Sequence, residues 1–369
     1  MVLNLRSFLL IIFSFFAISC SKNTEGESPD QLFEKYKGSV VIVAIQYYYE
    51  ILFDGITIYY SPGSEIDKKL FFDKNEALTN LSFASGTGFI VSKNGEIITN
   101  NHVINPKDDS YLNELNNLKS VISNYLKHDI DNYSDTIRSI NIDLNSSSEL
   151  DDLTIENLNS KLIDLNQKKD NLSNSLYRLQ NFNINTSDQK LVTIKIGIAY
   201  NDTHVSGLND LQDCVIIKAS KDPKVDLALL QTKSKVFNVP PNEIFSLGDN
   251  NSIFKRFLAV IKRVFIGEKR NIENPVKIND DVFMIGYNRG FTLANTRIGI
   301  KSQFTGGKIS QESDGEKILY TIPTLEGSSG SPIIDKWGNL VGVNFAKITD
   351  SQNFGLGVPV YEVKKFYLK

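Results

Sequence analysis

The stretch Gly86 to Ile104, GTGFIVSKNGEIITNNHVI, decides the fold of this chain. Two runs rich in β-branched and aromatic residues flank the turn Lys93-Asn94-Gly95. An Asn-Gly pair between apolar runs is a strong short-range signal for a β-hairpin. The second run leads directly into His102. The stretch therefore predicts a hairpin within a β-rich fold, with a histidine at the end of its second strand.

Two further segments extend this pattern along the chain. Residues 225–230 (VDLALL) place Asp226 at the start of an apolar strand, where its carboxylate would lie at the strand's edge. Residues 327–332 (GSSGSP) surround Ser329 with glycines ahead of a predicted strand. Such a turn exposes the serine hydroxyl and lets backbone N–H groups point inward. Each segment alone is weak or moderate evidence, but the order His, Asp, Ser matches the chymotrypsin arrangement and differs from that of subtilisin.

On these residues the chain resembles trypsin-like serine proteases of the bacterial HtrA type, with a secondary likeness to the glutamyl endopeptidases. The resemblance implies an all-β fold of two antiparallel six-stranded β-barrels, with the active site in the cleft between them. An α-helical hairpin would be inserted in the first barrel, between the histidine and the aspartate. The matching stretches are GTGFIVSKNGEIITNNHVI (86–104), KDPKVDLALLQ (221–231), SLGDNN (246–251), GSSGSPIIDKWGNLVGVNFA (327–346) and FGLGVPV (354–360).

The resemblance also implies a role for individual residues. Ser329 would be the nucleophile, His102 would carry its proton to the leaving amine, and Asp226 would hold the imidazole. The backbone N–H groups of Gly327 and Ser329 would form the oxyanion hole. No acid occupies the floor of the implied pocket, so an uncharged, small or aliphatic residue is expected before the cleaved bond. That pocket would be lined by Pro323, Val343, Asn344 and Phe345.

The sequence departs from the family pattern in three places. Ser328 precedes the nucleophile, where asparagine or aspartate is commoner, and Glu326 adds a charge near the oxyanion turn. Both residues favour the alternative of a protease fold that hydrolyses little. The chain ends at Lys369, so we expect no PDZ module and none of the peptide sensing of full HtrA proteins.

The N-terminus reads as an export signal. Arg6 precedes an apolar run of 11 residues (8–18), which is short of the roughly 20 that span a membrane. Ala17-Ile18-Ser19-Cys20 resembles a relaxed lipobox of bacterial lipoproteins. The resemblance implies a signal peptide over 1–19, an acylated Cys20 that anchors the exported protein to a bacterial membrane, and a tether over 20–37. The alternative is an ordinary cleaved signal with an incidental cysteine.

A helical insertion over 107–189 interrupts the predicted protease domain, which covers 38–106 and 190–369. Residues 108–182 contain no Gly or Pro. From Ile155 to Leu179, apolar residues alternate spacings of three and four as in a coiled coil, with Lys169 as the one polar exception. The run NSSS (145–148) separates two halves, and Ser148 is a candidate cap for the second. We expect an antiparallel helical hairpin. It would either fold onto the β-body or form an arm for a partner or for self-association.

Composition sets the remaining bounds. The chain has 369 residues, with 41% hydrophobic and 22% charged residues and a net charge of −3. These values exclude a disordered chain, a multi-span membrane protein and an electrostatic nucleic-acid binder. No metal-ligand cluster or phosphate-binding loop appears, so we expect no cofactor. Residues 50–82 read as a long connection without clear period. Residues 254–265 read as a basic amphipathic helix, which would lie either on the second barrel or on an anionic membrane.

The function expected from these features is a lipid-anchored serine endopeptidase of the cell envelope that acts on proteins or peptides. The alternative is a binding or scaffold lipoprotein with a latent or inactive trypsin-like fold, which would use the helical insertion to bind a partner. The three histidines help the assignment, because the resemblance gives no counterpart for His128 or His204.

Overall fold

The computed structural model describes residues 26–53, 55–63, 69–146, 151–184, 189–247, 276–311, 313–347 and 354–369. The predicted signal peptide, Cys20 and the segment 254–275 lie outside the described residues. Contacts divide the chain into two compact units, one of residues 1–45, 84–105 and 196–369, the other of residues 46–83 and 106–195. Within the described ranges, no helix combines the length and the apolar character that crossing a membrane requires.

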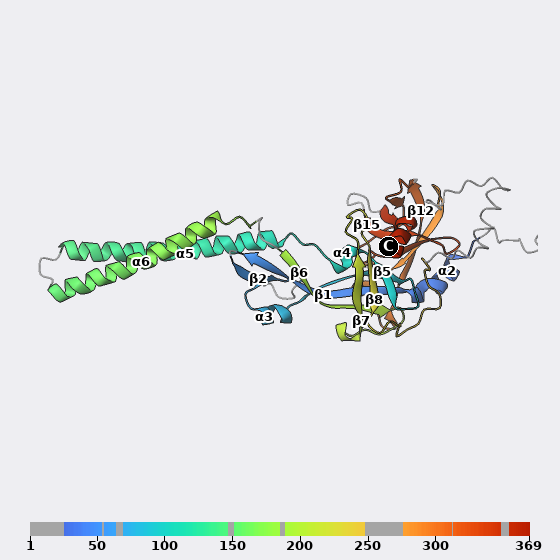
Figure 1. Cartoon of the computed structure of the whole chain (residues 1–369), viewed down its shortest axis with the longest axis horizontal. Coiled ribbons are helices and arrows are strands. Elements are labelled where there is room, and N and C mark those ends of the chain that lie inside the picture. Colours follow the sequence, from blue (N-terminus) through green and yellow to red (C-terminus); the bar gives the residue numbers. More distant parts are fainter. Residues whose placement is uncertain are drawn as a thin grey trace, which may run out of the picture. The chain divides into compact units, whose positions relative to one another are not determined.

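Six strands close the first barrel in the order β1-β4-β5-β8-β7-β6, with β6 pairing back to β1. The expected hairpin is confirmed, since β4 and β5 pair antiparallel with Phe89 opposite Ile98, and Gly95 at the turn has a φ of +81°. Apolar side chains from these strands fill the core, and β1 is buried at nearly every position. The strands are β1 (Val40–Phe53), β4 (Ser82–Ile90), β5 (Glu96–Thr99), β6 (Gln189–Tyr200), β7 (Gln212–Ala219) and β8 (Ala228–Thr232) (Figure 1).

Six more strands close the second barrel in the order β12-β13-β16-β15-β14-β9. Its neighbouring strands pair antiparallel around a buried cluster that includes Met284, Ile318 and Tyr320. Two six-stranded barrels confirm the predicted chymotrypsin-like fold. The strands are β9 (Asp281–Gly286), β12 (Gln303–Gln311), β13 (Ile318–Tyr320), β14 (Pro332–Asp335), β15 (Leu340–Lys347) and β16 (Gly355–Pro359).

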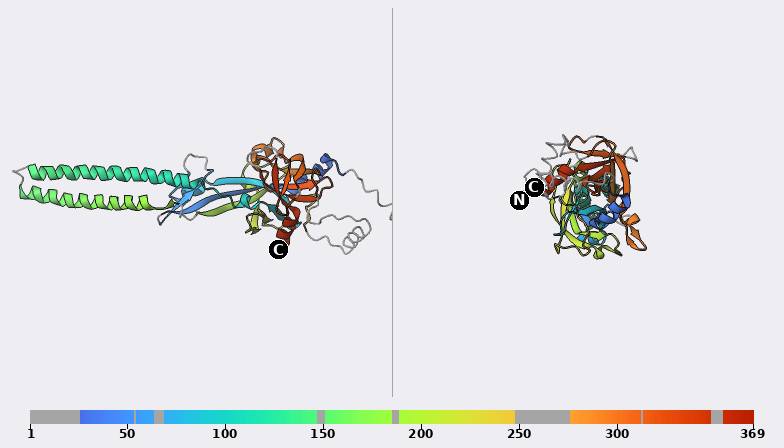
Figure 2. Two further views of the ribbon diagram at one scale, coloured as in Figure 1. Left: turned by 90° about the horizontal axis from the view of Figure 1, so that it is seen from above. Right: turned by 90° about the vertical axis from the view of Figure 1, so that its right-hand side faces the viewer.

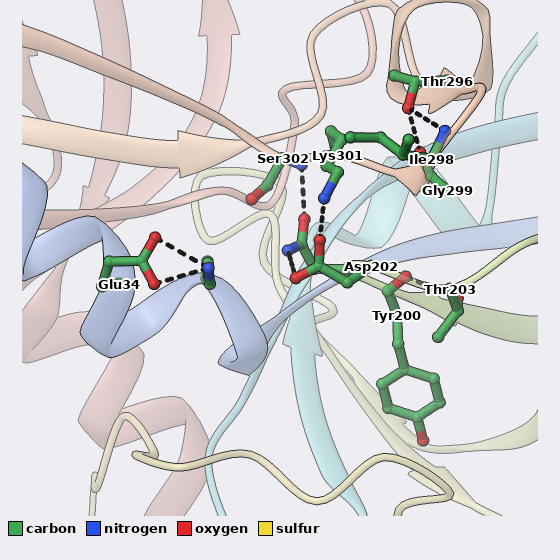
Figure 3. Close-up of polar contacts among 11 residues, drawn as sticks. Glu34, Tyr200, Asp202, Thr203, Thr296, Ile298, Gly299, Lys301 and Ser302 are labelled. Carbon is green, nitrogen blue, oxygen red and sulfur yellow. Dashed lines mark hydrogen bonds and ion pairs between the residues drawn. The ribbon is translucent and has the colours of Figure 1, made fainter.

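Short elements complete the first unit, and a polar network joins its two barrels (Figure 3). Asn201 Oδ1, in the turn after β6, accepts from Ser302 N at 2.8 Å. Lys301 bonds the Asp202 carboxylate, which lowers the pKa of that carboxyl. The short elements are η1 (Lys37–Ser39), η3 (Leu208–Asp210), α8 (Phe291–Ala294), β10 (Asn295–Thr296), β11 (Gly299–Ile300) and the C-terminal helix α9 (Val360–Leu368).

The expectation of a tether over 20–37 was wrong for its described second half, which contains helix α2 (Pro29–Tyr36). Ser28 caps this helix in a capping box with Gln31, and Pro29 favours its first turn. Leu32 is fully buried in the core, and the Tyr36 hydroxyl donates to Gly338 O at 2.9 Å. A polar stretch can therefore dock through one leucine and one tyrosine, whose burial contributes to the stability of the short helix.

The second unit also differs from expectation over residues 50–82. In place of an irregular connection, β1 continues to Phe53 and pairs with β2 (Ile56–Tyr60), with Tyr49 opposite Tyr60. Aromatic and β-branched residues stabilise such cross-strand pairs, which explains the hairpin. Strand β3 (Leu70–Phe71) and helix α3 (Lys74–Thr79) follow. Contacts group these residues with the helical insertion, so this unit is larger than the expected 107–189.

The predicted helical hairpin is present as α5 (Tyr111–Ser146) and α6 (Asp152–Asn181), which run side by side (Figure 2). The α6 seam is confirmed at Leu165 and Leu179, which are buried, whereas Ile155 is exposed. Ser148 lies outside the described residues, and the observed cap is Asp151, whose Oδ1 accepts from Thr154 N at 2.7 Å.

One polar residue that breaks the apolar register of α5 has a clear structural reason. Lys119 Nζ donates to Gln180 O and to Phe182 O, both at 3.0 Å. These carbonyls lie at the C-terminal end of α6, where the last turn lacks intrahelical donors and the helix dipole favours a cation. Lys119 therefore caps the C-terminal end of α6 at a position where the register would otherwise place an apolar residue.

Candidate active site

Strand pairing brings His102 and Asp226 to the same end of the first barrel. Strands β5 and β8 are antiparallel neighbours with Thr99 opposite Ala228. His102 lies in helix α4 (Asn101–Ile104), just after β5, and Asp226 lies just before β8. Residues that leave one strand and enter its antiparallel partner must meet at that end. The link is tightened by Asn100, whose Nδ2 donates to Asp226 O at 2.6 Å.

Both oxygens of the Asp226 carboxylate bind His102. The ring Nδ1 lies 2.5 Å from Oδ2, and the backbone N–H donates to Oδ1 at 3.0 Å. An ionised carboxylate only accepts, so Nδ1 carries a proton and the neutral ring presents Nε2 as the acceptor. The Asp226 side chain is 17% exposed and that of His102 is 46% exposed. The acid is thus covered while the imidazole stays open to an incoming group.

Ser329 lies in a tight turn ahead of β14. Gly327 and Gly330 adopt φ values of +90° and +88°, a region that favours glycine. A Cβ at Gly330 would lie 2.0 Å from Thr87 O, so only glycine fits between the turn and strand β4. The G-S-S-G spacing in the sequence therefore follows from two backbone requirements on either side of the serine pair.

Strand β4 holds the nucleophile turn beside the histidine. Thr87 N donates to Ser329 O at 2.8 Å. A Cβ at Gly86 would lie 2.5 Å from the side chain of Val103, which follows His102, and 3.1 Å from Ser329 O. Gly86 thus lies close both to the residue after His102 and to Ser329. The roles of His102, Asp226 and Ser329 as a catalytic triad stay a prediction. Among the described residues, neither His102 Nε2 nor Ser329 Oγ has a hydrogen-bond partner, as is common before substrate binds.

The two expected oxyanion donors are open. The N–H groups of Ser328, Gly330 and Ser331 donate to Leu325 O, Asn344 O and Ser328 O. By contrast, the N–H groups of Gly327 and Ser329 donate to no acceptor within the part of the chain that the structure describes. Two free N–H groups flanking the nucleophile are what stabilisation of a tetrahedral oxyanion requires.

The four predicted pocket residues have different environments. Pro323 is exposed and Phe345 is half-buried, so their assignment to the pocket stays a prediction. Val343 is fully buried in the core. Asn344 is 1% exposed and its amide binds the nucleophile turn, a contact that the sequence did not predict. The unusual Ser328 is also explained, since its hydroxyl donates to Leu325 O at 2.6 Å and supports the turn from within.

The other histidines lie apart from this arrangement. His128 is exposed on α5, and His204 is exposed in the segment after the β6 turn. Neither is paired with a carboxylate in the described ranges. Over those same ranges, no group of three or more His, Cys, Asp or Glu side chains is placed to hold a metal ion.

Two glycines with similar backbone conformations give a sharp stability prediction. Gly330→Ala should destabilise the protein by more than about 4 kcal/mol, because the new methyl meets the backbone of β4. Gly315 has a φ of +91° with nothing within 4 Å of a built Cβ, so Gly315→Ala should cost only about 1 kcal/mol. Denaturant unfolding of both variants measures the difference. Equal losses would show that the nucleophile turn is not packed against β4.

Comparison with known proteins agrees with this geometry. Residues 196–343, which include Asp226 and Ser329, match the trypsin-like peptidase domain family. The predicted resemblance to trypsin-like serine proteases is therefore confirmed over these residues. A crystal structure of the serine endoprotease from Yersinia pestis is also similar, with 15% identity and a TM-score of 0.42. That match covers 92% of this chain and 65% of the other, so this chain spans 65% of that protein's length.

Proposed function

We propose that this protein is a serine endopeptidase of the HtrA type that hydrolyses protein or peptide substrates. The observation that carries the proposal is the double contact of Asp226 with His102, on the same side of the fold as Ser329 and two open N–H groups. A merely structural histidine would not need both carboxylate oxygens and a ring edge open to solvent. Together these groups supply a base, a nucleophile and an oxyanion site.

In the proposed mechanism, each step of amide hydrolysis belongs to a named group. Ser329 Oγ attacks the substrate carbonyl carbon while His102 Nε2 takes the hydroxyl proton, and Asp226 stabilises the resulting imidazolium. The carbonyl oxygen becomes an oxyanion held by the N–H groups of Gly327 and Ser329. The C–N bond then breaks as His102 returns the proton to the leaving amine. Water, deprotonated by His102, cleaves the acyl-enzyme and regenerates the Ser329 hydroxyl.

We further propose that the enzyme is exported and held at a bacterial membrane through acylated Cys20, which rests on the N-terminal sequence alone. Several acyl chains would anchor it firmly, since each buried CH₂ contributes about 0.8 kcal/mol. Binding of a partner or a second copy through residues 107–189 also stays a prediction.

The proposal is tested by incubating the full chain, purified in mild detergent, with an unfolded protein and sequencing the products by mass spectrometry. New N-termini should appear with the parent and be absent with Ser329→Ala. Uncharged, small or aliphatic residues should precede the cleaved bonds. Equal cleavage by Ser329→Ala would contradict the proposal, as would a folded parent that releases no product from any unfolded substrate.

A further inference from the structure

Four consecutive carbonyl groups of the nucleophile turn accept hydrogen bonds from outside the turn. Glu326 O accepts from Arg289 N at 2.5 Å, and Ser329 O accepts from Thr87 N at 2.8 Å. Between them, Gly327 O accepts from the Thr87 hydroxyl at 2.9 Å, and Ser328 O accepts from Asn344 Nδ2 at 2.8 Å. The turn is therefore held at every peptide unit around the nucleophile.

Peptide planarity converts these carbonyl contacts into control of the oxyanion donors. All described peptide bonds are trans, so each N–H points opposite the carbonyl of the same peptide unit. The peptide that carries Ser328 O also carries Ser329 N–H. Ser328 O accepts from Ser331 N at 3.0 Å within the turn and from Asn344 Nδ2 at 2.8 Å from outside it. The Asn344 contact therefore helps to fix the direction of Ser329 N–H, one of the two open donors. The backbone of Arg289 does the same for Gly327 N–H through Glu326 O.

Asn344 is built into the turn by four contacts. Its Nδ2 also lies 3.1 Å from Ser328 Oγ, its backbone O accepts from Gly330 N at 2.8 Å, and its backbone N donates to Ser331 O at 2.9 Å. The side chain is 1% exposed, so little solvent competes for its amide. A buried amide with both groups engaged is a rigid support.

Tyr320 decides which way the Asn344 amide faces. Its hydroxyl donates to Asn344 Oδ1 at 2.6 Å, with a second, longer contact to Leu356 O at 3.2 Å. Burial raises the pKa of Tyr320 well above its usual value, so the phenol keeps its proton and remains a donor. Because Oδ1 is taken by a donor, Nδ2 is left to face Ser328 O.

We propose that Asn344, oriented by Tyr320, is a positioning residue that aims the Ser329 N–H at the oxyanion; this rests on the proposed function. The arrangement also gives a structural reason for Ser328, where asparagine or aspartate is commoner in the family. Ser328 has a short side chain that bonds only within the turn and to Asn344, so the contact to Ser328 O from outside the turn comes from the second barrel through Asn344. Asn344 thus shapes the catalytic turn rather than contributing a free amide to the substrate pocket.

The test measures how fast a fluorophosphonate probe acylates the full chain in mild detergent. Asn344→Ala should slow acylation about 10²-fold, since losing one oxyanion donor costs about 10²–10³ in rate. Tyr320→Phe keeps the ring and should slow it about 3–10-fold, the effect of one lost hydrogen bond. Tyr36→Phe is the matched control, because it removes a hydroxyl that donates to Gly338 O at 2.9 Å in the same unit. It should react within about twofold of the parent.

Two readouts separate positioning from a general structural role. Tyr320→Phe combined with Asn344→Ala should react no more slowly than Asn344→Ala alone, because Tyr320 acts through Asn344. The maximal acylation rate should fall while the half-saturating probe concentration and the shape of the pH–rate profile stay unchanged. If Asn344→Ala does not fold, the acylation rate of Tyr320→Phe is compared with that of Tyr36→Phe. A slower rate for Tyr320→Phe supports the positioning role.

The outcomes distinguish this inference from the proposed function. A parent that reacts, with Tyr320→Phe and Asn344→Ala folded and equally fast, overturns the positioning role and leaves the endopeptidase proposal standing. Equal slowing by Tyr320→Phe and Tyr36→Phe also overturns it, since any lost phenol would then suffice. A folded parent that does not react overturns the proposed function and the positioning role with it.

Discussion

Replacing His102 with alanine is expected to reduce the rate of substrate hydrolysis by about 10⁶-fold, the loss typical when the base of a catalytic triad is removed. The physical reason is that no other group in the described site can take the Ser329 proton. Asp226 holds the ring through Nδ1 and the backbone N–H, and it bonds His102 rather than the nucleophile. Steady-state hydrolysis of a fluorogenic peptide measures the effect.

The two remaining histidines provide matched controls for this prediction. His128 and His204 are both exposed, and neither lies in the site. Alanine at either position should leave the rate within about twofold of the parent, as expected for surface substitutions away from special features. A His102→Ala protein that remains active, or a His204→Ala protein that loses activity, would place the base elsewhere.

Asp226→Asn should lower the rate about 10⁴-fold while leaving the fold intact. The carboxylate accepts from Nδ1 at 2.5 Å and thereby selects the tautomer with a free Nε2. An amide of the same size can offer its NH₂ to Nδ1 instead, which favours the opposite tautomer and removes the base. The charge that stabilises the imidazolium is lost as well.

The same loop supplies the control for Asp226. Asp222 is exposed, and its carboxylate accepts from Lys224 N at 2.9 Å within the loop. Asp222→Asn should therefore leave the rate nearly unchanged in the same peptide assay. Equal losses from Asp222→Asn and Asp226→Asn would show that overall charge, rather than the imidazole contact, controls activity.

The hairpin and the residues of the candidate triad were predictable because their signals are local, whereas the two barrels were expected from the family resemblance. The Asn-Gly turn before Glu96 fixes the hairpin that ends at His102, and antiparallel pairing of Thr99 with Ala228 then brings Asp226 alongside. The glycines around Ser329 predict a turn with positive φ values, which Gly327 and Gly330 adopt. The helical hairpin was equally predictable, because its apolar residues recur at spacings of three and four over many turns.

What the sequence could not show depends on contacts between distant segments. Leu32 and Tyr36 dock helix α2 against a core built more than 200 residues later, as the Tyr36–Gly338 bond shows. By contrast, the pairing of Tyr49 with Tyr60 was predictable, because Asp54-Gly55 between Phe53 and Ile56 is a strong local hairpin signal. Asn344 was assigned to the pocket, because nothing near it in sequence reveals that Tyr320 directs its amide toward Ser328.

The most direct test of the central claim is fluorophosphonate labelling of the full chain in mild detergent, with the modified residue located by peptide mass spectrometry. We expect the parent to carry the phosphonyl group on Ser329, and Ser329→Ala and His102→Ala to remain unlabelled. Labelling at another serine, undiminished labelling of His102→Ala, or no labelling of a folded parent would contradict the account of an active site formed by His102, Asp226 and Ser329.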